Sequence, residues 1–330
     1  MAAANTVSTT LAEVVRQQAP DGSLLPIVES MEKLAPFLED AVWVQCNNGT
    51  FHRMNRRTAL PAPTRRRVNQ GIPSSLSSTN QVDEVTTQIA TKVTVDEDII
   101  TMNGPAYLAR EVAGHMMGHV QQVEGDLLSG SLATDPDAID GLETRLSATT
   151  NSPGGGQVVL VDAAPAGNDQ ASAVLIGWAE HGVHAVYPKG MPGGIAHRDF
   201  GLQPDAISDG TNTAPGFVHT FKWDYGLAVE DFRYCGRAAN IDTSAISLTG
   251  TNVITAMVTL HHRCNTRDKS ARWAYYLPRR LAEFLHQQAR SGVTNSTLQI
   301  QDIGGQPITT FLGHPVRTAD LLTITESIVA

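Results

Sequence analysis

Arginine side chains are concentrated in one short segment of the chain, FHRMNRRTALPAPTRRRVNQG, which spans residues 51–71. The segment holds six arginines and no acidic residue, although the 330-residue chain has a formal net charge of -9. A guanidinium group stays charged at neutral pH and binds a carboxylate or a phosphate through two parallel hydrogen bonds. The segment could therefore bind an acidic protein surface or a nucleic acid. The candidate residues are Arg53, Arg56, Arg57, Arg65, Arg66 and Arg67.

The composition around these arginines favours a protein partner over nucleic acid. Phe51 is the only aromatic residue of the segment, so the stacking surfaces that bind single-stranded nucleic acid are missing. The chain as a whole is acidic, with 33 acidic and 24 basic residues. A basic-loop DNA-binding protein stays open as the alternative function, and it would bind DNA with a steep dependence on salt concentration. A charged run that meets only solvent is the third interpretation.

Two other groups of side chains could do chemistry, but neither has a complete catalytic motif. His115 and His119 have the spacing of one helical turn that can chelate a metal, yet Met116 stands where a zinc protease has its glutamate. In the segment HHRC, His261 has helical spacing to the thiol of Cys264, but no third group at a recognisable spacing would orient the pair. We therefore expect no enzymatic activity, no bound metal and no cofactor.

The length and composition indicate an ordinary globular protein with room for two compact lobes. Hydrophobic residues make up 41% of the chain and charged residues 17%. No run of about eighteen apolar residues could cross a membrane, and residues 1–15 lack the basic start and apolar core of a signal peptide. Cys46, Cys235 and Cys264 are too scattered for a disulfide framework or a zinc cluster. We expect synthesis in the cytosol.

The arginines must be positioned by a long hairpin-like excursion that runs from Phe51 to Asp98. Its outgoing limb is TFHRMNRRTALPAPT, and its return limb, TTQIATKVTVDED, alternates apolar and polar residues as a strand does. The segment NQGIPSSLSSTNQ between them is polar and rich in glycine, proline and serine, which is typical of a mobile end. Because the excursion has too little apolar content to form a core, we expect its packing partner to lie elsewhere.

The strongest helical pattern follows this excursion and extends to about Leu128. Asn103 can cap the helix, and Pro105 suits its first turn. Three glycines weaken the pattern, so tertiary packing must stabilise the helix. The apolar residues at helical spacing are Leu108, Val112, Met116, Val120, Val123 and Leu127.

Short strands and helices follow each other irregularly in the second half of the chain, which is typical of the α+β class rather than of a doubly wound sheet. The segments QVVLVDA, SAVLIGWA, VHAVYPKG and RWAYYL predict strands, and FVHTFKWDYGLAVEDFRYCGRAANID predicts one long strand or a hairpin. NVITAMVTLHH and residues 279–290 predict helices. Two further strands flank Gly304 and Gly305. In FLGHPVR, Gly313 can take a positive φ before an extended His314.

Three separated stretches resemble signature sequences of a family of major capsid proteins from tailed bacteriophages, which has the Hong Kong 97-like fold. The resemblance follows the order of the chain and covers most of it. It implies an α+β subunit with an N-terminal arm, an extended loop (E-loop), a peripheral domain with a long spine helix, and an axial domain. The stretches are NNGTFHRMNRRTALPAPTRRRVNQG, FKWDYGLAVEDFRYCGRAANID and FLGHPVRTADLLTITE.

The resemblance divides the chain into six consecutive parts. The extended loop coincides with the arginine-rich excursion, and the spine helix coincides with the strongest helical pattern. The parts are the N-terminal arm, 1–48; the extended loop, 49–98; the peripheral domain with the spine helix, 99–150; a mainly axial segment, 151–216; the long strand of the peripheral domain, 217–242; and a second mainly axial segment, 243–330.

The resemblance implies a structural protein that assembles into hexamers and pentamers of an icosahedral phage head. The extended loop of such a subunit lies across a neighbouring subunit, so its arginines would pair with acidic groups of that neighbour. Arg237 and Asp242, in RAANID, are further candidates for a charge network between subunits, with a local surface charge as the alternative. Lys92 is the only lysine of the loop region, which gives no support for a covalent link between subunits.

The partners implied by the resemblance are other copies of the chain and separate scaffolding, portal and cement proteins. Packaged double-stranded DNA would be enclosed without sequence-specific contact, and no membrane partner is expected. The protein would be made in the host cytoplasm and would end in the capsid shell of the virion.

Overall fold

The computed structural model describes residues 35–150, 154–162, 169–208, 211–244, 253–291, 298–303 and 306–329. Of these residues, the first of two compact units comprises Gln88–Glu124 and Pro192–Asp224. The second unit comprises Leu34–Thr87, Gly125–Met191 and Tyr225–Ala330. Most of the predicted arm lies outside the described residues, and the boundaries of the six predicted parts stay a prediction.

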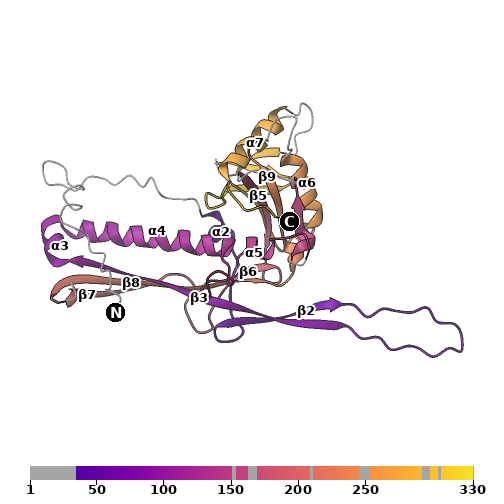
Figure 1. Cartoon of the computed structure of the whole chain (residues 1–330), viewed down its shortest axis with the longest axis horizontal. Helices are drawn as coiled ribbons and strands as arrows, with labels where there is room; N and C mark the ends of the chain where they lie inside the picture. The colour runs from indigo at the N-terminus through magenta and orange to yellow at the C-terminus, as the bar shows by residue number, and fades with distance from the viewer. Residues whose placement is uncertain are drawn as a thin grey trace. The chain divides into compact units, whose positions relative to one another are not determined.

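The arginine-rich excursion forms the antiparallel hairpin that the sequence predicts (Figure 1). Strand β2, Phe51–Ala59, pairs with β3, Ser78–Asp96, in a register that places Arg53 opposite Asp83. The residues between the two strands, 60–77, form neither helix nor strand and are exposed throughout. We call them the tip segment. The apolar residues of this region are too few to form a core of its own.

The first unit contains the long helix that the sequence predicts. Helix α4, Pro105–Ser129, follows the short helix α3, Glu97–Asn103. The two helices are separated at Gly104, whose φ is 80, so Asn103 ends α3 and the prediction that it caps α4 is wrong. A positive φ suits glycine and interrupts the helical hydrogen-bond ladder. The buried core of this unit consists of Val93, Val95, Ile99, Tyr107 and Phe221.

Two long strands complete the first unit and lead into the second. Strand β7, Ala196–Ser208, pairs antiparallel with β8, Thr213–Val229. Phe221 of β8 is fully buried and stacks on His197, with ring centroids 4.7 Å apart. The last residues of β8, from Tyr225, belong to the second unit, so β8 contributes to both units, as do β3 and α4.

The core of the second unit is a sheet centred on β5, Gln170–Trp178, whose nine residues are all buried. A strand covered on both faces needs apolar residues throughout, which explains the run SAVLIGW. Strand β5 pairs antiparallel with β9 and with β10, while β4 pairs parallel with β9 and β13 pairs parallel with β10. The bounds of the other strands are β4, Val158–Leu160; β9, Cys235–Asp242; β10, Arg272–Leu277; β11, Leu298–Ile303; β12, Gln306–Phe311; and β13, His314–Thr318.

Helices pack against this sheet through an apolar cluster that includes Met257, Leu260, Leu281 and Leu285. The two predicted helices are confirmed as α6 and α7. Within the described ranges, no helix is both long enough and apolar enough to cross a membrane. The helices and short turns are α2, Pro36–Asp40; α5, Leu142–Arg145; α6, Val253–Arg263; α7, Arg279–Ser291; and the 3-10 turns η1, Gly155–Gln157, and η2, Phe232–Tyr234.

The segment FVHTFKWDYGLAVEDFRYCGRAANID is neither one strand nor a hairpin, and this prediction is wrong. Strand β8 ends before the 3-10 turn η2, where the Asp231 side chain accepts a hydrogen bond from the Arg233 amide, and β9 follows. The two strands have different neighbours, because β8 pairs with β6, Val183–Tyr187, whereas β9 pairs with β4 and β5. Strand β1, Trp43–Gln45, lies parallel to β6.

The predicted turn in FLGHPVR is confirmed as a two-residue hairpin turn. Phe311 of β12 pairs with His314 of β13, and the two residues between them, Leu312 and Gly313, have φ values of 49 and 84. Two successive positive φ values match a type I′ turn, for which asparagine followed by glycine is preferred. Leu312 is therefore the strained position, because its Cβ crowds the backbone in this conformation.

We expect Leu312→Asn to raise the free energy of unfolding by roughly 0.5–1 kcal/mol, because asparagine tolerates a positive φ better than leucine. Gly313→Ala should lower it by about 1 kcal/mol. Chemical denaturation of unassembled subunits measures both changes. Ile324→Asn is the control, because Ile324 is exposed without a positive φ. An equal gain in the control would show that loss of an exposed apolar side chain, and not backbone relief, is the cause.

Candidate assembly interface

Arg53 is bound within its own hairpin. Its Nε and Nη2 donate hydrogen bonds to the two carboxylate oxygens of Asp83, each at 2.7 Å. Its guanidinium carbon also lies 5.2 Å from the centroid of the Phe51 ring. The bond from Arg53 lowers the pKa of the Asp83 carboxyl. Because both side chains are exposed, the pair contributes little to stability.

Arg56 attaches β2 to the residues at the end of β8. Its Nε donates to the backbone carbonyl of Glu230 at 3.2 Å, and its Nη2 donates to the carbonyl of Val229. The guanidinium lies 4.8 Å from the centroid of the Phe232 ring. Its Nη2 is also 3.4 Å from a carboxylate oxygen of Glu84. Arg56 therefore anchors the first strand of the hairpin to the second unit.

Glu84 of β3 is the centre of a buried charge network that no motif or spacing in the sequence indicates. The residue is 7% exposed, and its two carboxylate oxygens accept hydrogen bonds from Arg145 of α5 at 2.6 and 2.7 Å. Arg145 also donates to the carbonyls of Asp140 at 2.9 Å and Leu227 at 3.3 Å. A buried carboxylate is tolerated when it is paired and hydrogen-bonded in this way. The network therefore holds β3 to α5 and to the end of β8.

The other four arginines of the loop are exposed. In the part of the chain that the structure describes, the ion pairs formed by loop arginines are those of Arg53 and Arg56. Arg66 donates a hydrogen bond to the backbone carbonyl of Gln70. The charges of these four residues are thus available to a partner outside the chain. The exposed arginines are Arg57, at the end of β2, and Arg65, Arg66 and Arg67, in the tip segment.

Arg237 lies inside the second unit and is 4% exposed. It belongs to β9, as predicted, and its Nη2 donates to Glu326 at 2.7 Å while its Nε donates to the Ser172 hydroxyl at 2.9 Å. Asp242 ends the same strand and accepts hydrogen bonds from the amide and the hydroxyl of Ser244 at 2.8 and 2.7 Å. Both residues have partners in their own chain, and their place at a subunit interface stays a prediction.

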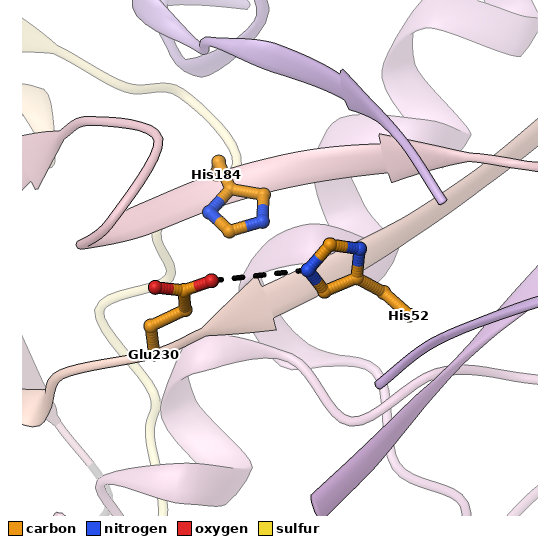
Figure 2. Close-up of side chains that lie close together, drawn as sticks. All are labelled: His52, His184 and Glu230. Atoms are coloured by element: carbon orange, nitrogen blue, oxygen red, sulfur yellow. Dashed lines mark ion pairs between the residues drawn. The ribbon is translucent and has the colours of Figure 1, made fainter. Parts of the chain in front are cut away.

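Two histidines and a glutamate converge at the base of the hairpin (Figure 2). His52 comes from β2, His184 from β6, and Glu230 follows β8 directly. The Nε2 of His52 lies 3.8 Å from Oε1 of Glu230. His184 is fully buried, and burial, with a smaller effect from nearby His52, lowers its pKa to about 4. At neutral pH the His184 ring is therefore uncharged.

These three side chains line a cavity of about 890 Å³ in the second unit. Sequence reasoning missed the group because its members come from separate segments and share no motif spacing. The pairing of β6 with the end of β8 brings His184 near Glu230, and the bonds of Arg56 hold β2, with His52, at the same place. Other residues that line the cavity include Asn47, Arg53, Arg56, Arg57, His181, Asp231 and Arg233.

The side chains singled out by their spacing in the sequence make other contacts. The Nδ1 of His119 lies 3.0 Å from the backbone carbonyl of His115, one turn earlier in α4. The Nε2 of His261 lies 3.2 Å from the Thr266 hydroxyl. Burial raises the pKa of the Cys264 thiol to about 12, whereas a nucleophilic cysteine needs a lowered pKa. The thiol of Cys264 is therefore not activated.

Glu143 makes the stability of this region depend on pH. Its Oε1 lies 3.9 Å from Nη2 of Arg237. Burial raises its pKa from 4.5 to about 7, against the lowering effect of Arg237, and Glu326 raises it further. The folded state therefore binds this proton more tightly than the unfolded state. The stabilisation that Glu143 contributes through this proton is fully present below pH 4.5 and is lost as pH rises to about 7.

Glu143→Gln should leave the free energy of unfolding nearly unchanged at about pH 4.5 and should raise it by about 1–3 kcal/mol at about pH 8, because glutamine stays uncharged. Denaturation curves at several pH values measure this difference. Glu180→Gln serves as the control at an exposed acid, where little change is expected at either pH. A gain that is larger at the acidic pH would contradict the assignment.

Known proteins with similar sequences and structures identify the family and the fold of this chain. A family model described as "Major capsid protein GP7" matches residues 19–330. No curated protein sequence matches the chain. A chain in the near-atomic structure of bacteriophage Epsilon15 is similar over 100% of both chains, with 26% identity and a TM-score of 0.77. A chain of the bacteriophage JBD30 capsid is similar over 96% of this chain and 99% of that one, with 12% identity and a TM-score of 0.52, and supports the fold alone.

These matches extend over nearly the whole chain and follow its mixture of helices and strands. The predicted α+β class and Hong Kong 97-like fold are therefore confirmed. The resemblance to phage capsid proteins, seen first in three short stretches, is confirmed as well. The chain belongs to the family of the major capsid protein GP7 and is a major capsid protein of a bacteriophage.

Proposed function

We propose that this capsid protein forms hexamers and pentamers that close into an icosahedral head, in which the extended loop, 49–98, lies across a neighbouring subunit. The observation that carries the proposal is the exposure of apolar side chains in the tip segment. Such a group of exposed apolar side chains is typical of a surface that another protein covers. The exposed fractions are 74% for Leu60, 92% for Val68, 79% for Ile72 and 91% for Leu76.

The exposed arginines would give this contact its specificity. A single exposed ion pair contributes little, but pairs repeated around a closed shell determine register and partner choice. The acidic composition of the chain, with 33 acidic residues, supports a partner surface on another copy. Arg53 and Arg56 hold the base of the loop in this account. The partners across the interface would be reached by Arg57, Arg65, Arg66 and Arg67.

The same proposal assigns the remaining parts of the subunit and its partners. Residues 1–48 act as the arm, α4 is the spine helix of the peripheral domain, and much of the chain after 243 forms the axial domain. The shell encloses double-stranded DNA without sequence-specific contact, which agrees with a net charge of -9 because phosphate binding needs cations. Scaffolding, portal and cement functions belong to separate proteins, and synthesis takes place in the host cytoplasm.

Replacing Arg65, Arg66 and Arg67 together by glutamine should prevent the closure of shells, because the neighbouring carboxylates lose their partners. The three residues are exposed, so the free energy of unfolding of the subunit should change by less than about 0.5 kcal/mol per residue. Negative-stain electron microscopy and light scattering measure assembly, and circular dichroism confirms the fold.

The matched control replaces three exposed arginines outside the loop, Arg198, Arg267 and Arg272, by glutamine, with the same loss of charge. Complete shells from the loop variant, in the yield of wild type, would show the proposal to be wrong. Salt-dependent binding of duplex DNA that the loop variant loses, while it still assembles, would favour the basic-loop DNA-binding alternative.

A further inference from the structure

The cavity at the base of the hairpin contains a set of potential metal ligands. His52 and His184 provide imidazoles and Glu230 provides a carboxylate, and one potential ligand atom of each lies within 4.8 Å of the others. Imidazole and carboxylate together suit Zn²⁺ and neighbouring transition metals. Ca²⁺ and Mg²⁺ prefer oxygen ligands alone. The chemistry of this group therefore points to a transition metal.

His184 gives an independent reason to expect a ligand at this position. Its side chain is fully buried, and neither ring nitrogen makes a hydrogen bond of ordinary geometry, although the backbone of Ala179 lies close to the ring. The Nδ1 of His52 is also buried without a hydrogen-bond partner. Buried polar atoms in proteins nearly always have partners, so these nitrogens call for an explanation. A metal bound to the His184 ring would supply one.

The charges around the cavity leave room for a cation. Four arginines line it; three are bonded to carboxylates of their own chain, and the fourth, Arg57, is exposed to solvent. The ion-pair partners of Glu230 are two histidines, His52 at 3.8 Å and His181 at 3.2 Å. The local positive charge is thus partly neutralised before a metal binds. The three neutralised pairs are Arg53 with Asp83, Arg56 with Glu84, and Arg233 with Asp231.

We propose that His52, His184 and Glu230 bind one divalent transition-metal ion, with Zn²⁺ as the representative ion. Zn²⁺ in a site with three protein ligands takes a fourth ligand, such as water, and has bonds of about 2.0–2.2 Å. The three side chains must therefore move closer together than their present spacing of up to 4.8 Å. The exposed His181, whose Nδ1 is 3.2 Å from Glu230, can replace the water.

The proposed ion would join the hairpin to the paired strands β6 and β8. It would link β2, the first strand of the hairpin, to β6 and to the residue that follows β8. The first strand of the hairpin begins at this point, so the ion would fix the direction in which the extended loop begins. This role concerns the subunit alone and does not depend on where the tip segment binds.

The test uses the full-length, tag-free protein after metal has been removed with a chelator. Calorimetry measures its titration with Zn²⁺, and visible absorption measures its titration with Co²⁺. We expect one ion per chain and the intense absorption of tetrahedral Co²⁺. Glu230→Gln, which keeps the size of the side chain, should weaken binding by at least about 10–100-fold, the loss expected even for an outer partner of a ligand. Zn²⁺ should slow hydrogen exchange of the β2 amides in wild type only.

His286→Gln is the matched control, because it removes an exposed histidine of α7 away from the cavity and should leave binding unchanged. His52→Gln is a second ligand variant, in case one substitution disturbs the fold. Circular dichroism without metal identifies a folded variant. The proposal is overturned if wild type binds Zn²⁺ no more tightly than Glu230→Gln, or if its Co²⁺ spectrum is that of an octahedral ion.

Discussion

The attachment of the extended loop depends on one buried carboxylate, that of Glu84. Arg145 binds it from α5 with two hydrogen bonds, and Arg56 of β2 approaches it to 3.4 Å. A buried charge is tolerated only with such partners, so this network fixes the base of the hairpin. The tip segment, in contrast, is exposed throughout. One end of the hairpin is therefore bonded within the subunit, while the other end presents apolar and basic groups to the outside.

Apolar area and charge have different roles in such a loop. Exposed side chains such as Leu76 favour association because they leave water, but they select no particular partner. Guanidinium groups select the correct partner surface, because a misplaced arginine loses its bound water without gaining a carboxylate. In the proposed assembly, a subunit with this loop would gain stability as a folded protein gains stability from a ligand. The inferred metal site lies at the bonded end and would reinforce it.

Local patterns predicted most elements, because helix α6 and strand β5 follow from residues within their own segments. The break at Gly104 escaped prediction, since one glycine is a weak signal within a long helical repeat. The burial and the contacts of the site residues depend instead on pairings between strands that are distant in the sequence. Arg237 was expected at a subunit interface, and its burial depends on Ser172 and Glu326, which no spacing connects to it. The histidines of the cavity were hidden for the same reason, because His52 on β2 and His184 on β6 come from strands that are distant in the sequence.

The most direct test of the account is a cryo-electron microscopy structure of the assembled particle that resolves side chains. We predict that the tip segment of one subunit lies on its neighbour, with its apolar side chains covered and Arg65, Arg66 and Arg67 within ion-pair distance of carboxylates of that neighbour. A tip segment that lies in solvent, or against packaged DNA, would contradict the central claim that this loop completes its packing by assembly.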